Sequence, residues 1–389
     1  MRQKNSRLDI ALYILIAALM TTGAFASGYF TRVIAERRDD KYPLLTEVQS
    51  LLATKYLGQL PPGAQLQYGA VRGLVSAVGD PYTVFLEPPA QELESQSLAG
   101  EFGGIGVALN RNEAGDVVLT AYPDLPAARA GVQSGDLLIE IGGAPVERGE
   151  SPDAISARIR GPVGSKVTIS VRRGGRANAL DFTLAREAIE LPSVTGSLLE
   201  QHPTIGLVTI SRFSEKTPSE VRQTAQDLKS QGATMLVLDL RGNGGGLLQS
   251  AIDTAGLFLD GGVIMHEKRR GEDERTFAAP ASGPLADMKL AILVNHGTAS
   301  AAEVLAGALH DRGRGPLIGQ QTYGKGSVQL VFTLSDNSSV HVTNARWYTP
   351  DHTVIDGGMG LKPDIELQPG TDGSDPELAR AITYLESLP

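Results

Sequence analysis

The chain contains no cysteine among its 389 residues. This excludes a disulfide framework and thiolate chemistry. The His-Glu-x-x-His pattern of zinc peptidases is also missing, so we expect no metal ion and no other cofactor. The chain has 35 lysines and arginines against 44 aspartates and glutamates, a net charge of −9. This acidic balance argues against nucleic acid as a partner. No internal repeat or low-complexity tract is found.

What the sequence does have is length, apolar residues for real cores, and a serine and a lysine in informative settings. A chain of 389 residues with 41% hydrophobic content suggests two or three domains. Ser300 lies in the segment Gly297–Glu303, and Lys325 lies in Tyr323–Gln329. A serine that opens a helix and a lysine beside a strand can form a catalytic dyad, in which lysine is the general base.

The residues around Ser300 predict a strand followed by a helix. The apolar run Lys289–Asn295 is typical of a buried strand, and helical spacing begins at Ser300. The serine would then lie at a helix N-terminus, where free N–H groups and the helix dipole favour a developing oxyanion. Serine is also a leading N-cap residue, and capping alone would explain its position.

The residues around Lys325 predict a strand with two different faces. Apolar residues alternate from Val328 to Leu334 and are expected to face the core, so Lys325, Ser327 and Gln329 share the other face. The glycines beside Lys325 suggest close backbone approach. A lysine base must lose roughly 3 pKa units from about 10.4, which burial can supply. Gln329 could orient the amine. An ordinary solvated strand face is the alternative.

A glycine-rich turn supplies a third element. The strand Met235–Leu240 runs into Arg241–Gly246, and a helical pattern follows from Leu247 to Leu259. Such a turn presents backbone N–H groups to an anion. With the N–H of Ala301, one glycine amide could complete an oxyanion hole.

Three motifs in this order resemble those of the carboxyl-terminal processing proteases, the tail-specific S41 peptidase family. They are Asp239–Gly245, the Ala-Ser-Ala-Ala-Glu segment at Ser300, and Tyr323–Gln329. The likeness runs from about Tyr42 to Ile365. It implies that Ser300 is the nucleophile, Lys325 the general base and Gln329 the residue that positions the lysine. It also implies an oxyanion hole made by Ala301 N–H and one of three glycines, Gly244, Gly245 and Gly246.

Residues 99–186 are similar to a PDZ domain, on the evidence of Gly103–Gly106 and the segment Pro126–Ile139. Such a domain adds a peptide as an extra strand and holds its terminal carboxylate in loop N–H groups. Val107 and Ile159 could equally be core residues. Taken alone, this segment would support only an adaptor. The expected peptide-binding residues are the glycine loop, the strand after it and the helix Pro152–Arg160, namely Gly103, Gly104, Ile105, Gly106, Val107, Ile155 and Ile159.

Three other interpretations of these motifs fail or are weaker. Gly319–Lys325 matches the start of a phosphate-binding P-loop, but Gly326 stands where Ser or Thr should bind magnesium, and a strand pattern follows. Gly242-Asn-Gly244 begins like a dinucleotide fingerprint, but Leu247 occupies its third glycine position. A Ser–His–Asp hydrolase would lack the usual Gly-x-Ser-x-Gly elbow. Its candidate histidines are His296, His310 and His341.

The N-terminus predicts a membrane segment. Basic residues precede an uncharged run from Ile10 to Thr31, which exceeds the about 20 residues that a spanning helix needs. The basic flank favours a cytoplasmic N-terminus. We therefore expect a single-pass protein of the cell membrane with an extracytoplasmic catalytic part. The segment Ala24–Ala26 resembles a signal-peptidase site, so a secreted or periplasmic enzyme cleaved near Ala26 is the alternative.

The expected architecture is multi-domain α/β, with an N-terminal membrane segment and helical section, a PDZ domain and a protease core with a mixed sheet. The segment Gly79–Phe85 resembles the family's stretch ahead of its second domain, and Asp375 is expected to cap a last helix. We expect a serine endopeptidase of the cell envelope that engages protein substrates by their C-termini; a homo-oligomer is left open. The expected parts are 1–35 (anchor or signal peptide), 36–98 (helical section), 99–186 (PDZ domain), 187–370 (protease core) and 371–389 (C-terminal helix).

Overall fold

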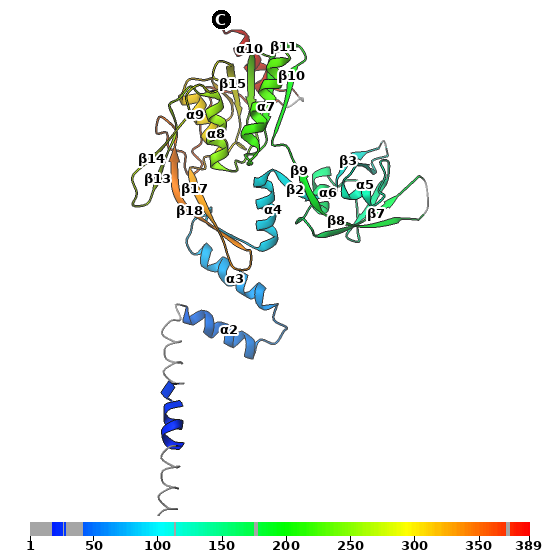
Figure 1. Ribbon diagram of the computed structural model, residues 1–389, viewed down its shortest axis with the longest axis vertical. Helices are drawn as coiled ribbons and strands as arrows, with labels where there is room; N and C mark the ends of the chain where they lie inside the picture. Colours follow the sequence, from blue (N-terminus) through cyan, green and yellow to red (C-terminus); the bar gives the residue numbers. More distant parts are fainter. Residues whose placement is uncertain (1–17, 26, 29–41, 113, 175–177, 371–373) are drawn as a thin grey trace, which may run out of the picture. The chain divides into compact units, whose positions relative to one another are not determined.

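The computed structural model describes residues 18–25, 27–28, 42–112, 114–174, 178–370 and 374–389 (Figure 1). The chain divides into two compact units, residues 1–74 and 75–389. Most of the membrane segment expected at Ile10–Thr31 lies outside the described residues. No helix in the described ranges is both long and apolar enough to cross a bilayer.

The first unit is helical, as the spacing predicts. It contains α2 (Pro43–Lys55) and most of α3 (Gly63–Ser76). Neither helix buries a residue. The apolar side chains of α2, among them Leu44 and Leu51, are exposed. An apolar stripe without a partner means that this helix draws little stability from packing within the described part of the chain.

The PDZ region is an antiparallel sheet of six strands in the order β3-β4-β5-β7-β8, with β6 paired to β5. Its core is centred on Ile105, Leu119, Ile155 and Ile169, which are fully buried. The helix expected at Pro152–Arg160 is α6, and Ser151 caps it by accepting a hydrogen bond from Ala154 N–H at 3.2 Å. The elements are β3 (Val107–Arg111), β4 (Val117–Ala121), α5 (Pro126–Arg129), β5 (Leu137–Ile141), β6 (Ala144–Pro145), α6 (Pro152–Ile159), β7 (Lys166–Arg172) and β8 (Leu180–Ala185). Just before β3 in the chain lies β2 (Glu101–Gly104), and it pairs with β9 (Glu187–Glu190), which follows β8.

The protease core is built on a mixed six-stranded sheet in the order β10-β11-β12-β15-β16-β19. Only the β10–β11 pair is antiparallel. The expected strands and helices at 235–240, 247–259, 289–295 and 376–388 are confirmed. Asp375 caps the last helix through Leu378 N–H at 3.0 Å. The elements are β10 (Val194–Leu199), β11 (His202–Ile210), α7 (Thr217–Ser230), β12 (Met235–Asp239), α8 (Leu248–Phe258), β15 (Lys289–Val294), α9 (Ala301–Asp311), β16 (Leu317–Gly319), β19 (Ile365–Glu366) and α10 (Pro376–Glu386).

Both faces of this sheet are covered by helices. Leu236, Leu238 and Ile292 pack with α7, α8 and α9, which lie together in Figure 1. The alternate residues Val237 and Leu293 pack with α10 on the opposite face. Because β12 and β15 are parallel neighbours, the turns after them emerge at the same edge of the sheet. Ligands of open α/β sheets bind at this carboxyl edge.

A second, antiparallel sheet carries the lysine segment. Its order is β1-β18-β13-β14, and β17 also pairs with β18. The expectation that the apolar side of β17 faces the core is wrong, because Leu330 is 39% and Phe332 52% exposed. Those residues lie on an exposed part of the β17–β18 hairpin, whereas Lys325, Ser327 and Gln329 line a cavity. The elements are β1 (Val84–Leu86), α4 (Pro88–Ala99), β13 (Val263–Arg269), β14 (Arg275–Ala278), β17 (Ser327–Thr333) and β18 (Ser339–Tyr348).

Candidate active site

Ser300 lies at the N-terminus of α9, held in a strained backbone conformation. Its φ is +55°, which a residue with a Cβ seldom adopts. The turn before it is fixed by Thr298, whose Oγ1 donates to Leu240 O at 2.8 Å and accepts from Asn295 N–H at 3.0 Å. Ser300 N–H donates to Glu303 Oε2 at 2.8 Å. The tertiary contacts therefore maintain the strain and fix the serine at a helix end.

Lys325 is held where three backbone segments approach closely, as the flanking glycines predict. A Cβ on Gly326 would lie 1.4 Å from Ile355 O, and Gly324 has a φ of +88°. The lysine N–H donates to Glu303 Oε2 at 2.9 Å, and its carbonyl accepts from Trp347 Nε1–H at 3.1 Å. Burial lowers the pKa of the Lys325 amine, against the opposing pull of the Glu94 and Asp80 carboxylates.

Glu303 joins the serine and lysine segments, a role that spacing did not predict. Its side chain is completely buried. Oε2 accepts from Ser300 N–H and Lys325 N–H, while Oε1 accepts from Thr322 Oγ1–H at 2.6 Å and Gly324 N–H at 2.7 Å. Ser-x-x-Glu is a capping-box signature, so half of this arrangement was readable from sequence. The other half depends on contacts across the fold.

The glycine turn after β12 packs against the serine. A Cβ on Gly245 would lie 3.0 Å from Ser300 Cβ, and one on Gly246 would lie 2.1 Å from Phe213 O. The N–H of Gly245 already donates to Asn243 Oδ1 at 2.9 Å. In the described part of the chain, the N–H groups of Gly244, Gly246 and Ala301 have no protein acceptor. These three amides remain available to a bound anion.

A cavity of about 320 Å³ gathers these groups. The amide nitrogen of Gln329 donates to Ser327 Oγ at 2.8 Å. The expected contact between Gln329 and the Lys325 amine is not among the hydrogen bonds of the described residues. An apolar wall is formed by Leu247, Leu248, Val304 and Trp347. The candidate residues that line the cavity are Gly244, Gly246, Ser300, Ala301, Lys325 and Gln329.

His341 lines the same cavity, with Nε2 3.0 Å from Glu94 Oε2. His341 is therefore the histidine to test as the base in place of Lys325. His310 lies instead between the carboxylates of Asp311 and Asp364. The strand β17 after Lys325 agrees with the rejection of a P-loop, which needs a helix there.

The groove expected in the PDZ domain is a small cavity of about 90 Å³. Five of the seven candidate residues line it, and two do not. Ile155 is fully buried in the PDZ core and does not line the groove. Gly103 lies against Gly161, where a Cβ would come within 2.0 Å of the carbonyl oxygen. The candidates that do line it are Gly104, Ile105, Gly106, Val107 and Ile159.

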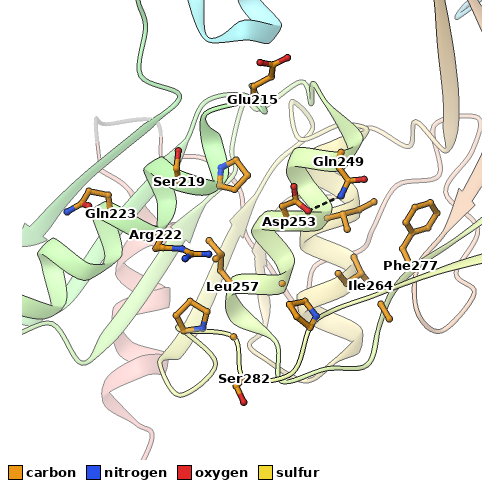
Figure 2. Close-up of a pocket in the computed structure, with 17 residues that line it drawn as sticks. Glu215, Ser219, Arg222, Gln223, Gln249, Asp253, Leu257, Ile264, Phe277 and Ser282 are labelled. Atoms are coloured by element: carbon orange, nitrogen blue, oxygen red, sulfur yellow. Dashed lines mark hydrogen bonds between the residues drawn. The ribbon is translucent and has the colours of Figure 1, made fainter.

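A second cavity and a cluster of possible metal ligands share no residue with the lining of the Ser300 cavity. A larger cavity of about 1070 Å³ is lined by residues of α7 and α8 and by the loop near Ser282; Figure 2 shows Gln249 donating to Asp253 there at 2.8 Å. It contains none of the candidate residues. Among the described residues, His266, Glu274 and His352 could together hold a metal ion. None of these three lines the cavity that holds Ser300.

Comparison with known protein families identifies both regions of the chain. The model of peptidase family S41 matches residues 204–367, and a PDZ domain model matches residues 117–173. The chain is thus a serine-type peptidase with a PDZ domain.

Relatives cover most of the chain. The carboxyl-terminal-processing protease of Synechocystis sp. is 35% identical over 318 residues, which is 81% of this chain and 74% of that protein. A probable CtpA-like serine protease of Staphylococcus saprophyticus is 30% identical over 94% of this chain and 74% of its own length. The carboxy-terminal processing protease CtpA of Bacillus subtilis is 32% identical over 86% and 70%. The chain belongs to the carboxyl-terminal processing proteases of family S41.

Replacing Glu303 by glutamine should impair catalysis more than folding. The amide keeps one acceptor oxygen but turns an NH₂ group toward two of the four donors, so the segments of Ser300 and Lys325 lose part of their shared anchor. We expect kcat to fall on the order of 10²-fold, as for a displacement of about 1 Å, with circular dichroism unchanged. The exposed Glu200→Gln variant is the matched control. Wild-type kcat in a folded Glu303→Gln enzyme would show that this carboxylate does not position the site.

Proposed function

We propose that the chain is an endopeptidase with a Ser300–Lys325 dyad that works through an acyl-enzyme. The observation that carries this is the cavity in which Ser300, Lys325 and unpaired backbone N–H groups meet, with both residues tied to one carboxylate. A nucleophile, a base and anion-binding amides are the three parts that acyl transfer needs.

The chemistry proceeds in two balanced steps. In the first, the Lys325 amine takes the Ser300 hydroxyl proton as Oγ bonds to the substrate carbonyl carbon. The ammonium then returns that proton to the leaving amine, and the C–N bond breaks. In the second step water gives a proton to the Lys325 amine and attacks the ester carbon. The Lys325 ammonium then returns the proton to Ser300 Oγ as the ester C–O bond breaks, and the acid product leaves.

Two features of the site support these roles. Burial of Lys325 favours the neutral amine that a base must be. The N–H of Ala301 and that of Gly244 or Gly246 would bind the oxyanion, because the N–H of Gly245 is already donated to Asn243. The apolar wall suggests that the residue before the scissile bond is apolar. Gln329 would act on the lysine only after leaving Ser327.

The PDZ domain would supply the second recognition event. A substrate C-terminus would add as a strand beside β3, with its carboxylate at the loop that contains Gly104 and Gly106 and its last apolar side chains in the groove. This assigns the protein substrate a fixed direction of entry. Cleavage would follow at the separate cavity that holds Ser300.

The location that we propose is the cell envelope, with Ile10–Thr31 as an uncleaved anchor and the catalytic part outside the cytoplasm. The support is in the sequence: basic residues before a long uncharged run.

Ser300→Ala and Lys325→Ala should each lower kcat by on the order of 10⁶-fold while the fold is kept, because nucleophile and base act as a unit. Lys325→Arg should be equally inactive, since arginine stays protonated.

In the wild type, kcat/KM should rise with pH through a lysine pKa below its ordinary value, because only the neutral amine is a base. Initial rates on a fluorogenic peptide measure all of this. Activity lost in His341→Ala but kept in Lys325→Ala would transfer the base to the histidine.

A substrate with a free C-terminal carboxylate should be cleaved faster than its amidated twin at subsaturating concentration. Amidation removes the charge that the loop N–H groups bind, so KM should rise while kcat stays nearly constant. The measurement is kcat and KM for the matched peptide pair. A third peptide with aspartates at its last positions should bind more weakly still, because a charge must be desolvated. Identical KM values for acid and amide would contradict recognition by the C-terminus.

N-terminal sequencing of the protein purified from membranes should find Met1 or a residue close to it, because an anchor is not removed. A chain that begins at Ser27 would show that the segment is a cleaved signal peptide instead.

A further inference from the structure

The segment Gly79–Phe85 has no part in the mechanism above, yet it contacts the lysine. Nζ of Lys325 lies over the ring of Tyr82, 5.0 Å from its centroid. An ammonium within about 6 Å of an aromatic ring centroid is attracted by the negative face of the ring. The base of the proposed dyad is therefore in contact with a side chain from a segment that is remote in sequence.

This segment is fixed where it meets the second sheet. Asp80 accepts from Tyr82 N–H at 3.1 Å and from Thr83 Oγ1–H at 2.6 Å, which closes a tight turn. Thr83 Oγ1 in turn accepts from Thr343 N–H on β18 at 3.1 Å. β1 begins at Val84 and pairs with the same strand. Tyr82 is thus presented by a rigid turn and not by a free loop.

Tyr82 contacts the lysine segment at a second point. Burial and the neighbouring Tyr323 hydroxyl, two residues before Lys325, raise the pKa of the Tyr82 hydroxyl. The N–H of Tyr323 donates to Thr298 O at 2.9 Å, in the turn that leads to Ser300. One side chain therefore lies against the amine and near the segment that carries it.

We propose that Tyr82 is a positioning residue for the general base: its ring holds the Lys325 amine at the cavity and stabilises the positive charge that the amine acquires when it takes the serine proton. This rests on the proposed function, in which Lys325 is the base. A ring supplies this stabilisation without adding a full charge. The ring therefore stabilises the transition state in which positive charge develops on the amine.

Other charged groups face the same amine and must be separated from the ring. Glu94 on α4 and Asp80 in the turn oppose the effect of burial on Lys325. On β18, Nε2 of His341 lies 3.0 Å from Glu94 Oε2. The carboxylate of Glu303 on α9 receives backbone N–H groups instead. A variant that removes only the aromatic face, and no carboxylate, isolates the contribution of Tyr82.

Two substitutions provide that comparison. Tyr82→Phe keeps the ring and loses only the hydroxyl, whereas Tyr82→Leu keeps an apolar side chain over the amine and loses the ring. Tyr82 is half-buried, so both variants should fold. Tyr323→Phe is the matched control, because it removes the neighbouring hydroxyl and leaves Tyr82 unchanged.

The readout is the pH dependence of kcat/KM on a fluorogenic peptide. Tyr82→Leu should move the acidic limb to lower pH by roughly 0.5 to 1 unit, because the ammonium loses stabilisation, and should lower kcat by about tenfold. Tyr82→Phe and Tyr323→Phe should keep the wild-type limb and a kcat within about threefold of the wild type. A purely structural role for Tyr82 would lower the rate without moving the limb.

A second measurement does not need turnover. In Ser300→Ala protein, the ¹³Cε signal of Lys325, assigned with Lys325→Arg, reports the amine pKa directly; Tyr82→Leu should lower it and Tyr82→Phe should not. Equal amine pKa values in the Leu and wild-type backgrounds, or the same limb with Leu, overturn the role of Tyr82 and leave the dyad intact. Activity of Lys325→Ala at the wild-type rate would overturn the dyad, and Tyr82 as positioning residue with it.

Discussion

The buried carboxylate of Glu303 is the interaction on which the site depends. A charge removed from water is costly unless hydrogen bonds replace its hydration. Glu303 receives four, and two of them come from the backbone of Ser300 and Lys325. The requirement to satisfy this one group fixes the turn after β15 against the loop before β17. Neither segment can shift without leaving buried donors and a buried charge unpaired.

The sheet places the glycine turn within reach of this pair. β12 and β15 are parallel neighbours, so the turns that carry Arg241 and Ser300 leave at one edge. Arg241 then binds Asp239 beneath the turn, and it also binds the α10 N-cap Asp375 and Glu377 in the first turn of that helix. These ion pairs raise the pKa of the Arg241 guanidinium, although its burial alone would lower it. The helix α10 and its N-cap thus fix the base of the glycine turn.

Sequence patterns predicted what is local and missed what depends on contacts across the fold. The strand before Ser300, the helix after it and the tight glycines around Lys325 follow from spacing within a few residues. The exposed face of β17 did not, because period two shows which residues share a face but not what covers it. Helical spacing likewise placed Ile155 and Ile159 on one face of α6. It did not show that Ile155 is fully buried in the PDZ core while Ile159 lines the groove. Glu303 and Tyr82 were overlooked as partners because their contacts join segments far apart in sequence.

In the mechanism proposed above, Lys325 has to meet two opposite requirements within one turnover. Before attack it must be neutral, and burial favours that form. After attack it carries the serine proton, and the same burial then penalises the ammonium. The groups that relieve this penalty come from elements outside the lysine strand: Glu94 on α4, Asp80 and the ring of Tyr82. Burial too complete would trap the amine as a base that cannot accept a proton, and too little would leave it permanently charged. Because these relieving groups lie on the elements around the cavity, a small movement of α4 or of the Asp80–Thr83 turn would change the basicity of Lys325 without touching Ser300.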